Sequence, residues 1–321
     1  MRNDESKKIV AGVDISSQEL VVRWSVDSQL LRVENNTKAI RELLGNLERK
    51  GVTLVVCEHT GRHEWELLQA LWKRGIPVHC AHPKAVRNFA KALSANAKSD
   101  PIDAEVILQY GLRMDLSPTE PPSPEFTALK ALTSRREDLN RMLVDEKNRL
   151  TAPALPSGTK RSLREHIRYL QKMLKTLEVE MRTLVAQHQS LKAPIECLDE
   201  EHGVGFVSAA TLYSSMPELG TLNKQTSAAL AGVAPFIRSS GKFSGQRKIY
   251  GGRTAARCAL YMVALTAIRN KTSPLRHFYL RLKAAGKHTS VAITAVMRKI
   301  IIRLNTRMKE LRAQQKIAAC C

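Results

Sequence analysis

The chain has 321 residues, of which 43% are hydrophobic and 25% charged, and its formal net charge is +21. This length accommodates two or three compact domains, and the composition excludes a wholly disordered polymer. No apolar stretch reaches the ~18 residues that a membrane span needs, and Met1–Glu5 do not begin a signal peptide, so we expect an intracellular protein without membrane contact. Its six cysteines lack the paired spacing of a disulfide framework, which favours reduced thiols.

The positive charge is concentrated late in the chain. Residues 236–321 hold nineteen Lys and Arg and one acid, Glu310, for a net charge of +18, whereas residues 1–235 carry a net +3. A surface of this kind binds polyanions by releasing counterions, which predicts nucleic-acid binding with a strong salt dependence. A solvated basic surface and contact with an anionic membrane are the alternatives.

The pattern from residue 8 to residue 113 predicts an α/β domain of the RNase H-like class, which we place at residues 1–118. Three leading strands should form an antiparallel meander, and the later strands should alternate with helices and pair in parallel. The prolines between residues 117 and 124 end the domain, because proline lacks the amide donor of a helix. The expected elements are strands 8–14, 19–26 and 29–34, helix 37–50, strand 52–58, helix 63–74, strand 77–81, and helices 83–94 and 101–113.

Two further regions are mostly helical. Leucines at heptad spacing predict a coiled-coil helical hairpin over residues 125–193, which could be an internal arm or a site of subunit pairing. Residues 194–321 form a basic region with expected helices at 224–231, 253–269, 274–285 and 289–313. The last helix is amphipathic, with Val291 among its apolar residues and with Arg298, Lys299 and Arg303 among its cations. Gly203 and Gly205 resemble a helix-hairpin-helix turn that grips phosphate, although they could also serve a tight turn alone.

Four acidic residues lie at the ends of expected strands or at the start of an expected helix, where their carboxylates can come together. Asp14 and Glu58 each close an apolar strand, and Asp100 and Asp103 lie at the start of a helix. Strand ends that are neighbours in a sheet meet in space, and hard cations prefer several oxygen ligands. We therefore expect a phosphodiester-cleaving site with two Mg²⁺ ions, or with Mn²⁺, on these four residues. Taken alone, Asp100 and Asp103 could be a helix cap and an acid favoured by the helix dipole.

A serine lies among cations in the basic region. Ser240 is a candidate nucleophile, because positive charge favours docking of a phosphate and stabilises charge developing at phosphorus. From the spacing alone, a loop that only contacts phosphate is the favoured interpretation, because serine-glycine pairs are ordinary loop residues and Ser239 and Ser244 compete for the role. The cations expected to contact nucleic acid here are Arg238, Lys242, Arg247, Lys248, Arg253 and Arg257. Zinc is disfavoured, because His59, His63, His79, His82, Cys57 and Cys80 form no tight paired signature.

These residues together resemble the DEDD transposases of the insertion-sequence one-ten family, relatives of the Piv and MooV recombinases. The resemblance covers nearly the whole chain. It rests on Gly12-Val13-Asp14-Ile15-Ser16, Glu58-His59-Thr60-Gly61, residues 98–104, Gly203-Val204-Gly205, residues 230–235 and Ser240-Gly241. It implies a RuvC-like domain that holds magnesium on Asp14, Glu58, Asp100 and Asp103, a coiled coil, and a transposase domain with Ser240 as nucleophile.

The resemblance also implies partners. It implies a bacterial cytoplasmic enzyme that works at the nucleoid and joins donor and target double-stranded DNA under the guidance of a non-coding bridge RNA. It implies dimers that assemble into tetramers, in which one subunit's carboxylates face another subunit's serine. The chain departs from the family pattern at Tyr250-Gly251-Gly252-Arg253, where many relatives carry a lysine-glycine step, and at His59, which replaces a smaller residue. The remaining alternatives are a junction-resolving nuclease that uses water, a protein-only invertase of the Piv type, and a non-catalytic RNA chaperone.

Overall fold

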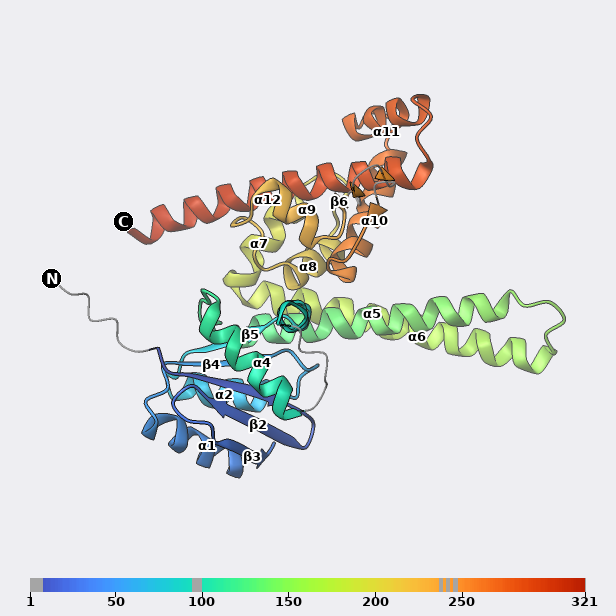
Figure 1. Cartoon of the computed structure of the whole chain (residues 1–321). Coiled ribbons are helices and arrows are strands. Elements are labelled where there is room, and N and C mark those ends of the chain that lie inside the picture. Colours follow the sequence, from blue (N-terminus) through green and yellow to red (C-terminus); the bar gives the residue numbers. More distant parts are fainter. Residues whose placement is uncertain (1–7, 94–99, 237–238, 241–242, 245–247, 321) are drawn as a thin grey trace. The chain divides into compact units, whose positions relative to one another are not determined.

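The computed structural model of the chain describes residues 8–93, 100–236, 239–240, 243–244 and 248–320 (Figure 1). Of residues 100–101, 239–240, 243–244 and 319–320 it describes the backbone alone. The chain divides into two compact units, Met1–Pro121 and Pro122–Cys321. The division falls within the proline-rich segment of the sequence. In the described part of the chain, no helix is long and apolar enough to span a bilayer.

Unit 1 is built on a mixed five-stranded sheet with the order β3-β2-β1-β4-β5. The first three strands form the expected antiparallel meander, and β4 and β5 continue the sheet in parallel with β1. Every expected element forms within two residues of its expected ends, and the arrangement fits the RNase H-like fold that the sequence predicted. The elements are β1 Val10–Ile15, β2 Glu19–Trp24, β3 Leu30–Glu34, α1 Thr37–Arg49, β4 Leu54–Glu58, α2 Trp65–Lys73, β5 Val78–Ala81, α3 Pro83–Ala92 and α4 Asp100–Arg113.

Helices cover both faces of this sheet. Alternate residues of a strand point to opposite faces, so each central strand contributes to two apolar cores. One core joins Val13 and Cys57 to the buried faces of α1 and α2. The other joins Val10 and Val56 to α3 and α4. β1 and β4 are therefore apolar up to their carboxyl ends, where Asp14 and Glu58 lie.

Two glycines allow α4 to lie unusually close to the sheet. A β-carbon on Gly12 of β1 would be 2.7 Å from the carbonyl oxygen of Ala104, and one on Gly111 of α4 would be 2.8 Å from side-chain carbons of Val10 and Val56. Real β-carbons do not approach other atoms this closely, so any larger residue would push the helix away. The close approach fixes the start of α4 against the carboxyl end of β1.

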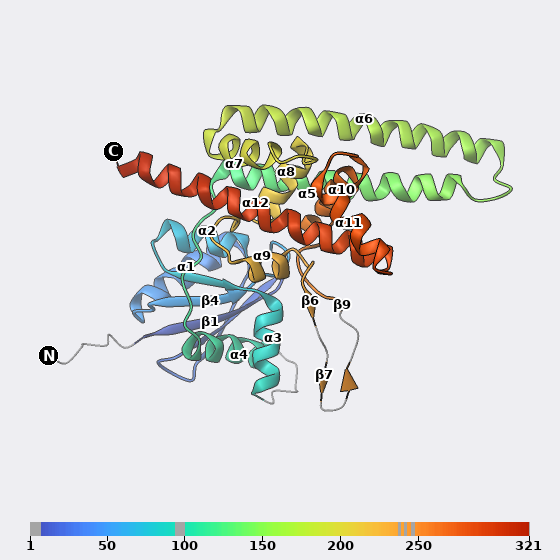
Figure 2. The same ribbon diagram turned by 90° about the horizontal axis from the view of Figure 1, so that it is seen from above.

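Unit 2 is almost entirely helical. Its two longest neighbouring helices, α5 and α6, lie side by side as a hairpin (Figures 1 and 2). The distal part of the hairpin has its own apolar cluster around Leu139 and Leu170, while Leu129 and Met181 at its base join the main core of the unit. The helices are α5 Pro124–Leu150, α6 Ser157–Gln187, α7 Gln189–Asp199, α8 Phe206–Ser215, α9 Lys224–Leu230, α10 Thr254–Arg269, α11 Pro274–Ala284 and α12 Thr289–Cys320.

The boundary expected between residues 193 and 194 falls inside α7, so the hairpin and the basic region share one compact unit. Pro194 removes one helical hydrogen bond, but it is buried beside Leu191 and Leu198, and this packing offsets the loss. The hairpin itself was expected. Supercoiling of its two helices as a coiled coil stays a prediction.

The segment around Ser240 contains two short ladders that its polar sequence does not predict. Short antiparallel ladders pair β6 Pro235–Phe236 with β9 Lys248–Ile249 and β7 Ser239–Ser240 with β8 Phe243–Ser244. We call residues 233–250 the serine arm. In Figure 2, β6 and β9 lie near α9, and β7 lies farther along the arm. Ladders of two residues carry no hydrophobic periodicity, which explains why the sequence did not reveal them.

Candidate functional site

Three of the four expected acids gather at one edge of the unit 1 sheet. Asp14 lies near the end of β1 and Glu58 closes β4, and these neighbouring strands run parallel. Both side chains belong to the face covered by α4, because they alternate with Val13 and Cys57 on the other face. Asp103 is in the first turn of α4, and its charge acts on Glu58 together with that of Asp14.

The environment of Glu58 disfavours a negative charge. Burial raises the pKa of Glu58 above its usual value, and the charges of Asp14 and Asp103 raise it further, while Arg87 on α3 lowers it. A divalent cation relieves the repulsion of gathered carboxylates, and their oxygen atoms are the ligands that Mg²⁺ and Mn²⁺ prefer. The side chains present therefore fit such an ion.

Asp100 and Arg87 also belong to the elements that surround these three acids. Asp100 begins α4, but its side chain lies outside the described atoms, so its part in the metal site stays a prediction. Arg87 was not expected from the sequence, since a single arginine in an amphipathic helix carries no signal of its own. The structure brings it close enough to Glu58 to favour the ionised carboxylate.

A second group of ionisable side chains follows Glu58 directly. His59 Nδ1 lies 3.1 Å from Oε1 of Glu64 and 3.3 Å from Sγ of Cys80. Glu64 and Cys80 are buried, whereas His59 is exposed. Because Cys57 and Cys80 belong to the core beneath α1 and α2, this group lies on the opposite face of the sheet from the α4 side. We call these three residues the His59 cluster.

The three groups shift one another's protonation. A hydrogen bond with Cys57 and another with His59 lower the pKa of Cys80 to about 6, while the hydrogen bond with Cys80, together with burial, raises the pKa of Cys57. The contact with Cys80, reinforced by Glu64, raises the pKa of His59 to about 9. Burial raises the pKa of Glu64, but hydrogen bonds from its own amide, His59 and Thr60 outweigh it and lower the pKa to about 2.

The serine arm leaves and rejoins unit 2 at a crossing of two glycines. Gly232 and Gly252 both have positive φ, at +70° and +75°, and a β-carbon on Gly252 would collide with the backbone of Gly232 and lie 2.9 Å from the carbonyl oxygen of Leu230. Only glycine fits both the conformation and the space. The arm is thus anchored at a defined point, with Ser240 in β7 beyond it. The side chain of Ser240 and all of Arg238, Lys242 and Arg247 lie outside the described atoms.

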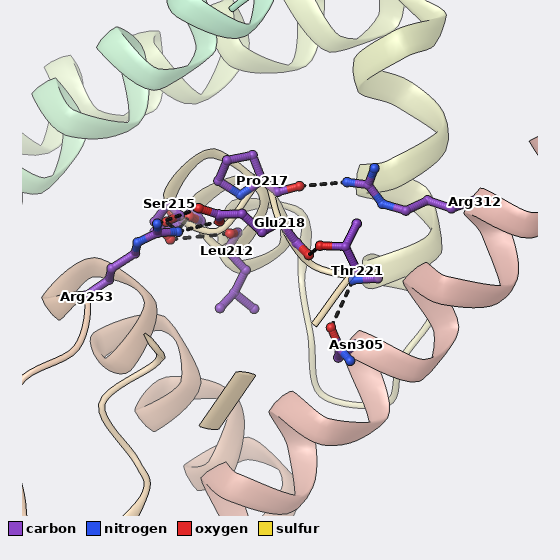
Figure 3. A network of polar contacts seen from close by, with 10 residues as sticks. Leu212, Ser215, Pro217, Glu218, Thr221, Arg253, Asn305 and Arg312 are labelled. Carbon is purple, nitrogen blue, oxygen red and sulfur yellow. Dashed lines mark hydrogen bonds and ion pairs between the residues drawn. The ribbon is translucent and has the colours of Figure 1, made fainter. Parts of the chain in front are cut away.

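A polar network holds the base of the arm (Figure 3). Arg253 donates two hydrogen bonds of 2.6 Å to the carboxylate of Glu218 and one of 2.8 Å to the carbonyl oxygen of Ser215. From α12, Arg312 donates to the carbonyl oxygen of Pro217, and Asn305 accepts a hydrogen bond from the amide of Gly220. Arg253 was expected to contact nucleic acid, but here its guanidinium joins the start of α10, just after the arm, to the loop after α8. Sequence spacing gave no sign of this role.

The expected basic residues fall into two groups. Lys248 and Arg298 line an open groove between the arm and α12, together with Lys287 and Val291. Lys287 was missed by the sequence analysis, and Val291 is 53% exposed although it was expected in the apolar stripe of α12. The other cations have protein partners: Arg303 pairs with Glu201 at 3.1 Å, Lys299 lies over the ring of Phe278, and Arg257 donates to the carbonyl oxygen of Gly251.

The glycine turn at residues 203–205 connects α7 to α8. Gly203 has a φ of +90°, and Gly205 is the N-cap residue of α8. A β-carbon on Gly203 would be 3.5 Å from the carbonyl oxygen of Val263, so the turn packs against α10. Gly205 is exposed at a helix N-terminus, a position that suits a phosphate. Phosphate binding by this turn stays a prediction.

The sequence is similar to known transposases and recombinases. Residues 11–156 match a family model described as a transposase, and residues 195–280 match that of the transposase IS116/IS110/IS902 family. Relatives include the pilin gene-inverting proteins of Moraxella bovis, 26% identical over 252 residues, and of Moraxella lacunata, 27% identical over 255, each match covering 77% of both chains. A Thermus thermophilus RuvC structure is similar over 35% of this chain and 99% of that chain, at 17% identity and a TM-score of 0.25. The chain therefore belongs to the IS116/IS110/IS902 family of transposases and is a DNA-acting enzyme.

Proposed function

We propose that this protein is a metal-dependent recombinase that joins donor and target DNA through a covalent link at Ser240. The observation that carries the proposal is the gathering of Asp14, Glu58 and Asp103 at one sheet edge, where burial and then the charges of the other two acids raise the pKa of Glu58. Such a site suits a phosphate-cleaving metal centre. Two Mg²⁺ ions, or Mn²⁺, would be held by these residues and Asp100, and would stabilise the charge that develops on the phosphate oxygens.

The serine supplies the nucleophile in this scheme. Its hydroxyl oxygen attacks the scissile phosphorus, the bond from phosphorus to one DNA oxygen breaks, and the hydroxyl proton passes to solvent while the leaving oxygen becomes a DNA hydroxyl. In the second step, a hydroxyl of the other DNA attacks the phosphoserine, which restores the serine and joins the new strands. One bond to phosphorus forms and one breaks at each step, so the energy of the phosphodiester is retained without an external cofactor.

Positive charge around the arm supports DNA docking. Lys248, Lys287 and Arg298 line the groove beside the serine arm, and they can neutralise phosphates there. The acids belong to unit 1 and the serine arm to unit 2. We infer that a complete site combines carboxylates of one subunit with the serine of another, in dimers that assemble into tetramers.

The sequence resemblance extends the proposal to a guide. A structured RNA transcribed beside the gene would pair with the donor and target DNA, so that base pairing reads the sequence and the protein supplies the chemistry. The excess of cations in residues 236–321 is compatible with holding both RNA and DNA. We expect the protein to act in the bacterial cytoplasm at the nucleoid.

A covalent intermediate provides the direct test. Purified full-length protein is incubated with Mg²⁺, labelled DNA carrying the element's ends, and RNA transcribed from the flanks of the gene. A slowly migrating protein–DNA conjugate on a denaturing gel is expected for the native protein and for Ser239→Ala and Ser244→Ala, but not for Ser240→Ala. Unchanged conjugate in Ser240→Ala would overturn the assignment. Cleavage without any conjugate would instead identify water as the nucleophile.

DNA inversion without RNA is a second candidate function. The observation that favours it is the similarity to two pilin gene-inverting proteins over 77% of the chain. The two candidates share the proposed chemistry and differ in the guide. Recombination by protein treated with ribonuclease supports inversion by protein alone, and loss of recombination that added RNA restores supports the guided enzyme. Recombination of either kind excludes a non-catalytic RNA chaperone.

A further inference from the structure

We propose that the His59 cluster is a second, softer metal site, which takes one Zn²⁺-type transition-metal ion separately from the carboxylate site. The three side chains offer a nitrogen, an oxygen and a sulfur ligand, all within 4.8 Å of one another. This donor set is that of Zn²⁺ or Co²⁺ and differs from the all-oxygen set that Mg²⁺ prefers.

The geometry favours an ion over a catalytic relay. In a Cys-His-acid triad, the thiol and the acid contact different nitrogens of the imidazole ring. Here Glu64 and Cys80 both approach Nδ1 of His59, at 3.1 Å and 3.3 Å. Metal–ligand bonds of about 2.0–2.3 Å at tetrahedral angles place neighbouring ligand atoms about 3.3–3.6 Å apart, close to both observed separations. Three donors that converge on one point can share one cation.

The surroundings hold the acidic ligand in place. Oε2 of Glu64 accepts hydrogen bonds from the amide and hydroxyl of Thr60 and from the amide of Arg62, at 2.9–3.2 Å, which leaves Oε1 directed at His59. Ligand carboxylates in metal sites are commonly fixed by such outer hydrogen bonds. Arg62 also adopts a φ of +97°, which bends the loop so that its amide reaches Glu64. The loop is thus shaped around the carboxylate.

The charge of the His59 cluster and its access to solvent also suit a divalent metal ion. A cysteine thiolate and a glutamate carboxylate together balance a divalent ion, and neutral imidazole completes the ligand set. Cys80 is 8% exposed and Glu64 is 7% exposed, while the His59 side chain is 54% exposed, so the ion would enter past the imidazole and keep a water as its fourth ligand.

The position of the site gives it a structural role. His59 follows Glu58 in the chain, Glu64 precedes α2, and Cys80 belongs to the neighbouring strand β5. An ion bound by all three would tie the loop after β4 to β5 and steady the backbone that carries Glu58. The alternation of side chains places this site on the opposite sheet face from Asp14 and Glu58, so the two kinds of metal would not compete for ligands.

Cobalt binding tests the proposal without DNA or enzymatic activity. The full chain, with Cys258, Cys320 and Cys321 replaced by serine to remove three of the five thiols outside the cluster, is titrated with Co²⁺ in excess Mg²⁺. We expect a thiolate-to-cobalt charge-transfer band that saturates at one equivalent and disappears on addition of Zn²⁺. Cys80→Ser should lose the band, His59→Ala should weaken binding at least about tenfold, and Cys197→Ser should behave as its parent.

Each result of the cobalt titration either supports or contradicts the proposed metal site. Absence of a band in the parent protein, or a full band in Cys80→Ser, would overturn the site. If Cys80→Ser fails to fold, the exposed His59→Ala decides, because full cobalt affinity in that variant contradicts the proposal equally. Failure of the Ser240 conjugate test leaves this spectroscopic result untouched, so the two proposals stand or fall separately.

Discussion

A β-carbon on Gly12 would lie 2.7 Å from the carbonyl oxygen of Ala104, the residue that follows Asp103 in α4. The helix carrying one acid therefore rests directly on the backbone of the strand carrying another. Glycine at this position is a condition for gathering Asp14 and Asp103 at one edge.

Gly12→Ala should displace α4 and destabilise unit 1 by about 1–3 kcal/mol, because the added methyl collides with helix backbone that cannot rotate away. Gly45→Ala is the matched control: Gly45 lies within α1, and nothing approaches its β-position within 4 Å. That control should leave stability unchanged or raise it by up to about 1 kcal/mol. Thermal unfolding measures both, and equal melting temperatures for the two variants would contradict the close approach.

Asp103→Asn should separate stability from activity. Removing one negative charge relieves part of the repulsion on Glu58, so the stability of the variant should depend less on a bound cation. The increase in melting temperature on adding Mg²⁺ should shrink, and strand cleavage should be lost. Melting curves with and without Mg²⁺ provide the measurement. A variant that gains as much stability from Mg²⁺ as the native protein would argue against Asp103 as a ligand.

Gly252→Ala should disturb the serine arm beyond the effect of backbone strain. Gly286→Ala is the control, because Gly286 has a similar φ of +73° but open space around its β-position. Both changes introduce a strained left-handed residue at about 1–2 kcal/mol, and only the first adds a collision with Gly232. We expect conjugate formation to fall at least about tenfold in Gly252→Ala and to persist in Gly286→Ala. Similar yields in the two would show that the crossing does not position the arm.

Glu218→Gln should make the folding stability of the protein depend less on pH below neutrality. Burial raises the pKa of Glu218, but its contact with Arg253 outweighs this and leaves the pKa below the usual 4.5. The unfolded chain then binds the proton more tightly, so the stability from this carboxylate is present above pH 4.5 and is lost as pH falls through the lower folded pKa. The variant should lose up to about 1 kcal/mol at neutral pH, because solvent screens this partly exposed pair, and less in acid. A constant difference in melting temperature between neutral pH and pH of about 3 would refute this linkage.

Arg298→Gln should weaken DNA binding about equally for all sequences and reduce the slope of log affinity against log salt by about one. Arg298 lines the groove beside the arm, whereas Arg303 is paired with the buried Glu201. Arg303→Gln should therefore lower stability more than affinity. Binding isotherms of the two variants at several salt concentrations provide the measurement. A larger loss of affinity in Arg303→Gln than in Arg298→Gln would show that DNA does not bind in this groove.

The helices and strands of unit 1, and the acids at their ends, could be predicted from the local sequence pattern. Runs such as Ile9–Val13 and Leu54–Cys57 alternate with amphipathic helices, and this local periodicity predicts secondary structure before any contact is known. The charge of residues 236–321 likewise indicated a polyanion partner, since net charge needs no structure to be counted.

Which side chains meet became visible only in the folded chain. The approach of α4 to Gly12, the Gly232–Gly252 crossing, the pairing of Arg253 with Glu218 and the His59 cluster all join residues from separate elements. Zinc was disfavoured from the sequence because a paired spacing was absent, yet His59, Glu64 and Cys80 come together from a strand end, a loop and the next strand. Such contacts depend on sheet register and helix packing, which are properties of the folded chain and leave no periodic trace in the sequence.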